Sequence, residues 1–92
     1  MIRSFRNAAT ERFAAGGRSR FRGLDEPKAR LRLDQLNAAV TPQSMGVLKS
    51  VGLHMLKGDR AGYWAVTING PWRLVFRFAN GDAHDVEIVD YH

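Results

Sequence analysis

Acid–base side chains follow one another near the end of the sequence, where Asp90, Tyr91 and His92 supply a carboxylate, a phenol and an imidazole. The rest of the chain offers few further groups of this kind; His54 is one of them, although a lone histidine inside a strand is more often a structural residue. Cleavage of a phosphodiester needs proton transfer together with cations that stabilise charge on the phosphoryl oxygens. The sequence therefore points to phosphodiester chemistry on a nucleic acid, with four candidate phosphate ligands: Lys57, Arg60, Arg73 and Arg77.

Two of these arginines lie in a segment that alternates like a β-strand. Over residues 72–78 the alternation places Arg73, Val75 and Arg77 on one face and the bulky apolar residues on the other. We expect the bulky face to point into the core. The two guanidiniums should then lie exposed, where each could bind a phosphate through a pair of hydrogen bonds.

A hairpin turn should bring the end of the sequence beside this strand. Asn80-Gly81 is a strong signal for a two-residue turn, and residues 83–90 alternate again. Counting outward from the turn places a residue near position 90 opposite one near position 71. We therefore expect Arg73 and residues 90–92 to be neighbours.

The other elements must hold this hairpin in place. Helices are expected after Asn7, ending at Gly16-Gly17, and after Asp25, because both residues are good N-caps and glycine ends helices. Alternation, with β-branched and aromatic content, predicts strands at residues 2–5, 53–56, 63–68, 72–78 and 83–90. The predicted fold class is α+β, with two N-terminal helices packed on a small, mainly antiparallel sheet in the order β-α-α-β-β-β(-β).

The second helix is expected to bury one apolar stripe, in which Ala29, Leu33, Leu36 and Val40 recur at helical spacing. Its basic residues fall largely off that stripe. They belong to a wider asymmetry, because residues 1–32 hold nine Lys or Arg against three Asp or Glu, whereas residues 33–92 hold five against six. Such a surface attracts nucleic acid, a ribosome or an acidic protein partner, or it serves only solubility.

The length of 92 residues favours one domain over residues 1–92. The lack of cysteine excludes disulfides and thiolate metal sites, and no paired ligand spacing indicates a metal or cofactor. Neither a membrane-spanning apolar run nor a secretion signal stands out, so we expect a cytoplasmic protein that has no contact with membranes.

The sequence resembles HigB-type toxins, which are small killer proteins of the RelE/ParE superfamily, in four segments: LKGDRAGYW at residues 56–64, WRL at 72–74, NGDA at 80–83 and DYH at 90–92. The resemblance spans essentially the whole chain and is strongest from residue 54 onward. The first segment together with the last is specific. The N-terminal helices match only in length, pattern and basic character.

This resemblance implies a RelE-like fold, similar to microbial ribonucleases, and the toxin of a type II toxin–antitoxin system. Such a toxin would cut mRNA in the ribosomal A site without a metal. Its partner would be a helix-turn-helix antitoxin of the HigA type, and the complex would bind operator DNA through that antitoxin and repress its own operon. The important family positions correspond to His54, Lys57, Arg73, Asp90, Tyr91 and His92.

The chemistry of these residues fits cleavage by the 2′-hydroxyl of the RNA itself. Either His54 or Asp90 would be the base and His92 the acid, since an imidazole has an ordinary pKa of about 6.5. Tyr91 would stack on or hydrogen-bond to a nucleotide. Which group acts as base stays open. Docking on the ribosome would fall to the basic N-terminal third, with these candidate residues: Arg18, Arg20, Arg22, Lys28, Arg30 and Arg32.

Two alternatives use the same fold without RNA cleavage. A ParE-like inhibitor of DNA gyrase would bind its target and would have no need of acid–base groups at His54 and residues 90–92. A pure RNA-binding module would use the same side chains only to hold phosphate.

Overall fold

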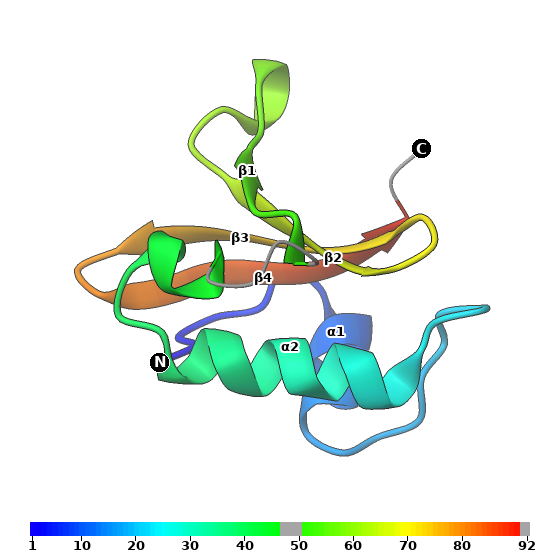
Figure 1. Ribbon diagram of the computed structural model, residues 1–92. Helices are drawn as coiled ribbons and strands as arrows, with labels where there is room; N and C mark the ends of the chain where they lie inside the picture. The colour runs from blue at the N-terminus through cyan, green and yellow to red at the C-terminus, as the bar shows by residue number, and fades with distance from the viewer. Residues whose placement is uncertain (47–50, 91–92) are drawn as a thin grey trace.

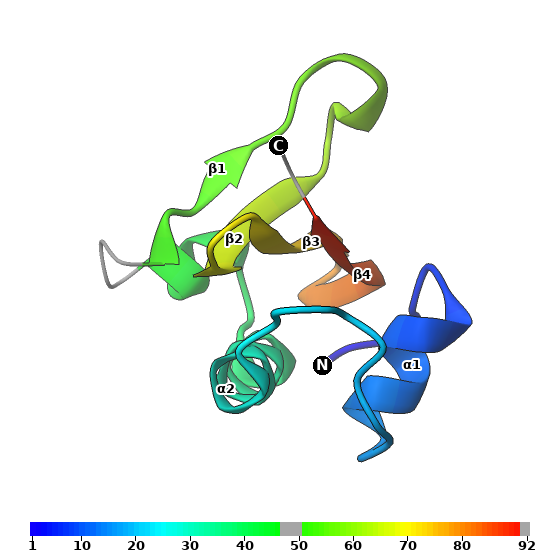
Figure 2. The same cartoon turned by 90° about the vertical axis from the view of Figure 1, so that its right-hand side faces the viewer.

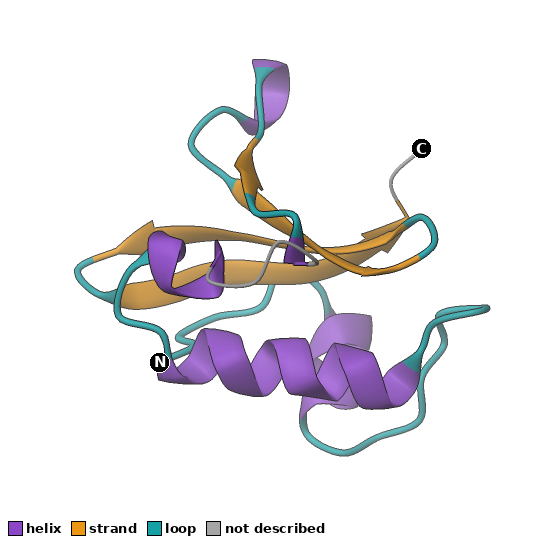
Figure 3. Ribbon diagram, viewed as in Figure 1, coloured by secondary structure: helices purple, strands orange, loops and turns teal. Residues whose placement is uncertain are grey.

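A four-stranded antiparallel sheet with both α-helices on one side organises the computed structural model, which describes residues 1–46 and 51–90 (Figure 1). The elements in chain order are α1 (Ala8–Ala14), α2 (Glu26–Ala38), the 3-10 helix η1 (Pro42–Gly46), β1 (His54–Met55), the 3-10 helix η3 (Gly58–Arg60), β2 (Trp64–Asn69), β3 (Trp72–Ala79) and β4 (Asp82–Asp90). The strands lie in the order β1-β2-β3-β4 (Figure 3). The predicted α+β class with two N-terminal helices is confirmed.

Both α-helices begin at the predicted caps. The side chain of Asn7 accepts a hydrogen bond from the backbone N–H of Thr10, and that of Asp25 accepts one from Lys28. Each cap satisfies a donor that has no partner inside the helix. Neither helix, and no other helix in the described part of the chain, is long and apolar enough to cross a bilayer.

The apolar stripe of α2 is shorter than predicted. Ala29, Leu33 and Leu36 are buried, but Val40 is 69% exposed. The helix ends at Ala38 and the backbone becomes extended at Ala39, so Val40 falls outside the helical period. The core between the helices and the sheet is completed mainly by Phe13, Val66, Ile68, Leu74, Phe76, Val86 and Ile88.

Arg32 occupies this interface instead of the solvent. It is only 5% exposed, its Nε donates to the Thr67 carbonyl at 3.0 Å, and its Nη1 donates to Gln35 Oε1 at 3.1 Å. A buried guanidinium must be hydrogen-bonded in this way because its desolvation is costly. The expectation that Arg32 contacts the ribosome is therefore wrong, since the side chain links α2 to β2.

The outer edge of β4 is covered by the N-terminal segment. The predicted strand at residues 2–5 is reduced to two isolated parallel bridges, Ile2 with Ala83 and Phe5 with Val86. Farther along β4, the buried hydroxyl of Thr10 accepts a hydrogen bond from the Ile88 N–H at 3.1 Å. A side chain of α1 thus satisfies an edge donor that would otherwise be open to pairing with another strand.

The face of the sheet away from the helices carries a second, smaller apolar cluster. Figures 1 and 2 show β1 and the loop with η3 standing on that side. Leu56 from this region packs with Ala65 and Val75, and Tyr63 and Val89 lie against them. The prediction that Val75 is exposed is wrong, because the segment from β1 to β2 folds over it and leaves it 0% exposed.

The β3–β4 pairing follows the hairpin count to within one residue, since Trp72 pairs with Asp90. The register then shifts between the pairs Val75–Glu87 and Arg77–His84, so that two residues of β4 oppose Phe76 of β3. Asp85, one of those two, has φ +52°. This is a β-bulge, which bends a strand and redirects a side chain.

The bulge brings the Asp85 carboxylate to two partners on the open face. Arg77 Nε lies 2.8 Å from Asp85 Oδ2, and the Tyr63 hydroxyl donates to the same oxygen at 3.2 Å. The hydrogen bond from Arg77, with a smaller contribution from Tyr63, lowers the pKa of Asp85, and the same contact raises the pKa of Arg77. Arg77 is thus not the unengaged phosphate ligand that the strand pattern suggested.

Replacing Arg32 tests its structural role. Arg32→Met keeps an aliphatic side chain but leaves the Thr67 carbonyl without its donor, so we expect a loss of about 1–3 kcal/mol in the free energy of unfolding. Lys28→Met on the exposed side of the same helix is the control, with an expected change below about 0.5 kcal/mol. Urea unfolding measures both. Equal losses would contradict the assigned role.

Replacing Asp85 tests the bulge ion pair. Because the folded pKa of Asp85 is lowered, the pair stabilises the fold above the ordinary carboxyl pKa of about 3.9, and this stabilisation is lost as the pH falls through the folded pKa. Asp85→Asn keeps a residue that tolerates positive φ. It should be less stable than the wild type at neutral pH, by a margin that shrinks below about pH 4. Asp59→Asn is the control, and a pH-independent margin in urea unfolding would refute the linkage.

Candidate functional site

The candidate site lies on the sheet face away from the helices. His54 of β1 pairs with Ala65 of β2, Ala65 with Val75 of β3, and Val75 with Glu87 of β4. Paired residues point to the same side of an antiparallel sheet, so one row runs from His54 to Glu87 across the open face. The fold thus places the exposed His54 on the same face as the basic residues of β3.

Hydrogen bonding fixes the tautomer of His54. Its Nδ1 lies 3.1 Å from the carbonyl oxygen of Gly52. A carbonyl can only accept, so Nδ1 must donate, and in the neutral ring Nε2 is left as the basic nitrogen. The exposed imidazole is therefore arranged to take up a proton at Nε2.

Glycine is needed at position 52 for this arrangement. The residue has φ +62°, and a Cβ built on it would lie 2.9 Å from Thr67 Oγ1. Both the backbone angle and the close approach to the Thr67 side chain disfavour a larger residue. The conformation of Gly52 thus positions its own carbonyl group, which accepts the hydrogen bond from His54 Nδ1.

Arg73 lies in the neighbouring row, between Thr67 of β2 and Val89 of β4. It lies two interstrand spacings across the sheet and two residues along the strand from His54, or about 12 Å between the Cα atoms at ordinary strand geometry. Its Nη1 donates to the Gly70 carbonyl at 2.6 Å and to the Trp72 carbonyl at 3.0 Å. Half-buried and held by the β2–β3 turn, the guanidinium has other donors left for a ligand.

Lys57 and Arg60, on either side of the Gly58-Asp59 turn, have different surroundings. Arg60 Nη1 lies 3.0 Å from Glu87 Oε1, and Arg6 Nε lies 3.8 Å from the same oxygen. Arg60 therefore links η3 to β4 through an ion pair. The sequence analysis predicted Arg60 as a phosphate ligand and did not predict this structural contact. Lys57 is exposed and meets no hydrogen-bond or ion-pair partner among the residues that the structure describes.

Asp90 is exposed at the end of β4, opposite Trp72. Arg73 is the next residue along β3, so the two are near in register, as predicted. Strand alternation nevertheless puts them on opposite sides of the hairpin. Tyr91 and His92, the remaining members of the predicted catalytic group, lie outside the described residues.

Glu87, Asp85 and Tyr63 are parts of this face that the sequence analysis missed. The only available signal was the excess of acidic residues in residues 82–90. Their partners could not be deduced, because the bulge changes which β4 side chains lie beside each β3 residue. In the described part of the chain, no group of three or more His, Cys, Asp or Glu is placed to hold a metal ion.

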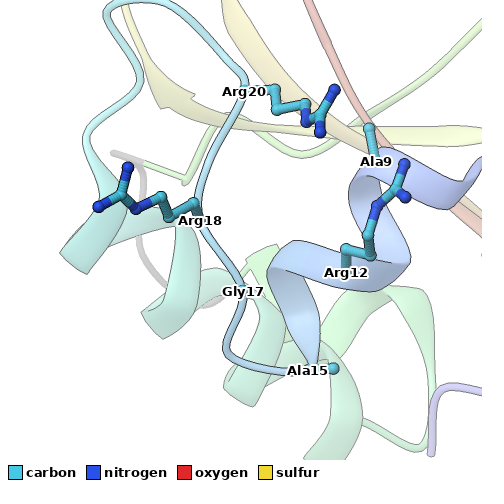
Figure 4. Close-up of a pocket in the computed structure, with 6 residues that line it drawn as sticks. All are labelled: Ala9, Arg12, Ala15, Gly17, Arg18 and Arg20. Carbon is cyan, nitrogen blue, oxygen red and sulfur yellow. The ribbon is translucent and has the colours of Figure 1, made fainter.

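The six arginines and lysines expected to bind the ribosome are divided by the structure. Arg32 is buried, and Arg30 stacks over the Phe13 ring at 4.1 Å while it donates to the Phe13 carbonyl. Arg22 and Lys28 are exposed, and the Arg22 carbonyl accepts a hydrogen bond from Trp72 Nε1, close to the β3 end that faces Asp90. The other two, Arg18 and Arg20, line a hollow beside α1 (Figure 4).

Comparisons with known proteins agree with this architecture. A protein of Proteus vulgaris named Endoribonuclease HigB is 46% identical over 61 residues, which cover 64% of this chain and 66% of that protein, just under two thirds of its length. The crystal structure of a YafQ mutant from E. coli superposes with a TM-score of 0.61 over 92% of this chain and 88% of that one, at 14% identity, and so shares the fold. The family model of the RelE-like toxin of the type II toxin–antitoxin system HigB matches residues 3–92, and the chain therefore belongs to this toxin family.

Proposed function

We propose that this chain is an endoribonuclease toxin that cuts mRNA on the ribosome and thereby stops translation. The observation that carries the proposal is the geometry of His54, whose Nδ1 is committed to Gly52 and whose Nε2 is left to accept a proton on an exposed face. Family membership supports the same activity, since the similar protein of Proteus vulgaris is named as an endoribonuclease.

The proposed reaction is attack by the RNA 2′-hydroxyl on the adjacent phosphorus. His54 Nε2 takes the hydroxyl proton, the new P–O bond forms, and the 5′-oxygen leaves with a proton supplied by His92. Arg73 and Lys57 bind the phosphoryl oxygens as negative charge develops on them. Asp90, on the other side of the hairpin from Arg73, is assigned the orientation of the acid, and Tyr91 stacks on or hydrogen-bonds to a nucleotide. The reaction assigned to these residues uses no metal.

Docking on the ribosome would hold the mRNA in the reacting geometry, which can contribute several kcal/mol to the rate. We assign this docking to the exposed cations Arg22, beside the start of β3, and Lys28 on α2, whose side chains have no hydrogen-bond or ion-pair partner among the described residues. The site of action would be the cytoplasm. The partner would be a helix-turn-helix antitoxin, through which the complex would reach operator DNA.

The gyrase-inhibitor alternative is not favoured, because the matching family model is that of the HigB toxins. A cleavage assay distinguishes a pure RNA-binding role from catalysis. The purified chain is incubated with mRNA on programmed ribosomes, with the same mRNA free, and with supercoiled DNA and gyrase. Cuts only on ribosomes support the proposal, and binding without cuts, or trapped gyrase–DNA complexes, contradicts it.

The His54 assignment predicts a large loss on substitution. His54→Gln keeps a donor toward Gly52 but removes the basic nitrogen, so we expect the cleavage rate to fall about 10²–10⁴-fold. Single-turnover cleavage on ribosomes measures the rate. A variant that keeps the wild-type rate would show that another group is the base.

Arg73 and Arg77 form a matched pair for the phosphate ligand. Arg73→Lys keeps the charge but loses the planar pair of donors, and we expect a loss of at least about tenfold in cleavage. Arg77→Lys makes the same change at a residue already paired with Asp85, and its loss should be smaller. Equal losses in single-turnover assays would argue against the separate role of Arg73.

A further inference from the structure

A basic hollow opens beside α1, on the helix side of the sheet and away from His54. Its volume is about 360 Å³, and it lies between α1 and the loop that follows it (Figure 4). Volumes of this size are typical of ligand pockets. The lining residues are Ala9, Arg12, Ala15, Gly17, Arg18 and Arg20.

The walls of the basic hollow are fixed by contacts within the protein. The Gly17 N–H donates to the Arg12 carbonyl at 2.8 Å, and a Cβ on Gly17 would lie 2.7 Å from that oxygen. Arg30 reaches the loop from α2, with Nη1 2.8 Å from the Phe13 carbonyl and Nη2 3.3 Å from the Gly17 carbonyl. These bonds also occupy carbonyls at the end of α1 that would otherwise repel an anion.

The arginine side chains around the basic hollow have no ion-pair partner among the residues that the structure describes. Arg12 and Arg20 extend towards one another across the opening, while Arg18 points away (Figure 4). Their guanidiniums make no hydrogen bond or ion pair with any residue in the described ranges. Two like charges that face each other favour an anion between them, and a carboxylate matches guanidinium geometry.

The inner surface of the basic hollow favours a peptide over a polynucleotide. Methyl groups of Ala9 and Ala15 contribute to the lining, so the cations surround a partly apolar cavity. A peptide with a carboxylate beside an aliphatic side chain can satisfy both parts. The sugar carbons of the RNA backbone all lie beside oxygen atoms, so the backbone offers charge but no purely apolar side group. The basic hollow is also on the far side of the sheet from His54, where the cleaved mRNA is proposed to bind.

We propose that the basic hollow binds an acidic segment of the cognate antitoxin, with a Glu or Asp carboxylate between Arg12 and Arg20. This inference rests on the proposed function only for the existence of that partner, which membership of a type II toxin–antitoxin family implies. Binding there leaves the face with His54 uncovered. The antitoxin would therefore be anchored by electrostatic contacts at a distance from the catalytic residues.

Charge reversal at the basic hollow tests this assignment. The dissociation constant for the purified cognate antitoxin is measured by calorimetry for Arg12→Glu, Arg20→Glu and the double variant, with circular dichroism to confirm folding. Each single change should weaken binding at least tenfold, and the double variant more. Arg12→Lys keeps the positive charge and loses only the planar pair of donors. It should weaken binding less than Arg12→Glu. Lys28→Glu makes the same charge change outside the basic hollow and should alter the constant less than threefold.

Three results would overturn the inference. Unchanged antitoxin affinity in the Arg12 and Arg20 variants would remove the site. An equal loss in Lys28→Glu would show a general charge attraction. Loss of ribosome affinity with antitoxin affinity intact would assign the basic hollow to RNA. Because these binding measurements need no cleavage, failure of the nuclease proposal would leave them interpretable.

Discussion

The pairing of β3 with β4, including its bulge, is the constraint on which the rest of the structure depends. Its register places Trp72 opposite Asp90, and alternation from there assigns every β3 side chain to a face. β3 carries β2 and β1 on one side, while β4 receives the N-terminal segment on the other. A slip by one residue would turn Leu74 and Phe76 to solvent and bury Arg73. The fully buried apolar residues on one face of β3 therefore fix the position of the cations on the other.

The bulge separates the cations of the open face into two groups. By turning Asp85 towards Arg77 and leaving Glu87 beside Arg60, β4 neutralises two guanidiniums with its own carboxylates. Lys57 and Arg73 have no such described ion pair. Exposed ion pairs contribute little to stability, but they fix side chains and remove charge from the field that a phosphate would meet. Lys57 and Arg73, on which the charge is not neutralised by a described carboxylate, are then the cations of this face that would attract an anion.

Local rules predicted the features that depend on a few adjacent residues. Asn80 and Gly81 both adopt positive φ, as a two-residue hairpin turn requires, and both helix caps are where side-chain chemistry placed them. The burial of Val75 and Arg32 could not be predicted in this way. Each depends on a segment distant in sequence: Val75 on the chain around Leu56, and Arg32 on the carbonyl of Thr67. The bulge left no sequence signal because Asp85 replaces the glycine that usually marks positive φ.

Contacts between distant segments also limit how much of the candidate site could be predicted from the sequence. Residue types selected His54 and four candidate cations, because acid–base and phosphate chemistry draws on few side chains. The resemblance to HigB-type toxins singled out Lys57 and Arg73 among those cations. What residue types could not supply is the role of Gly52, which adopts φ +62° against Thr67 and offers its carbonyl to His54 Nδ1. That single acceptor decides which ring nitrogen is basic. An exposed histidine in a two-residue strand thereby acquires a defined orientation from the backbone beside it.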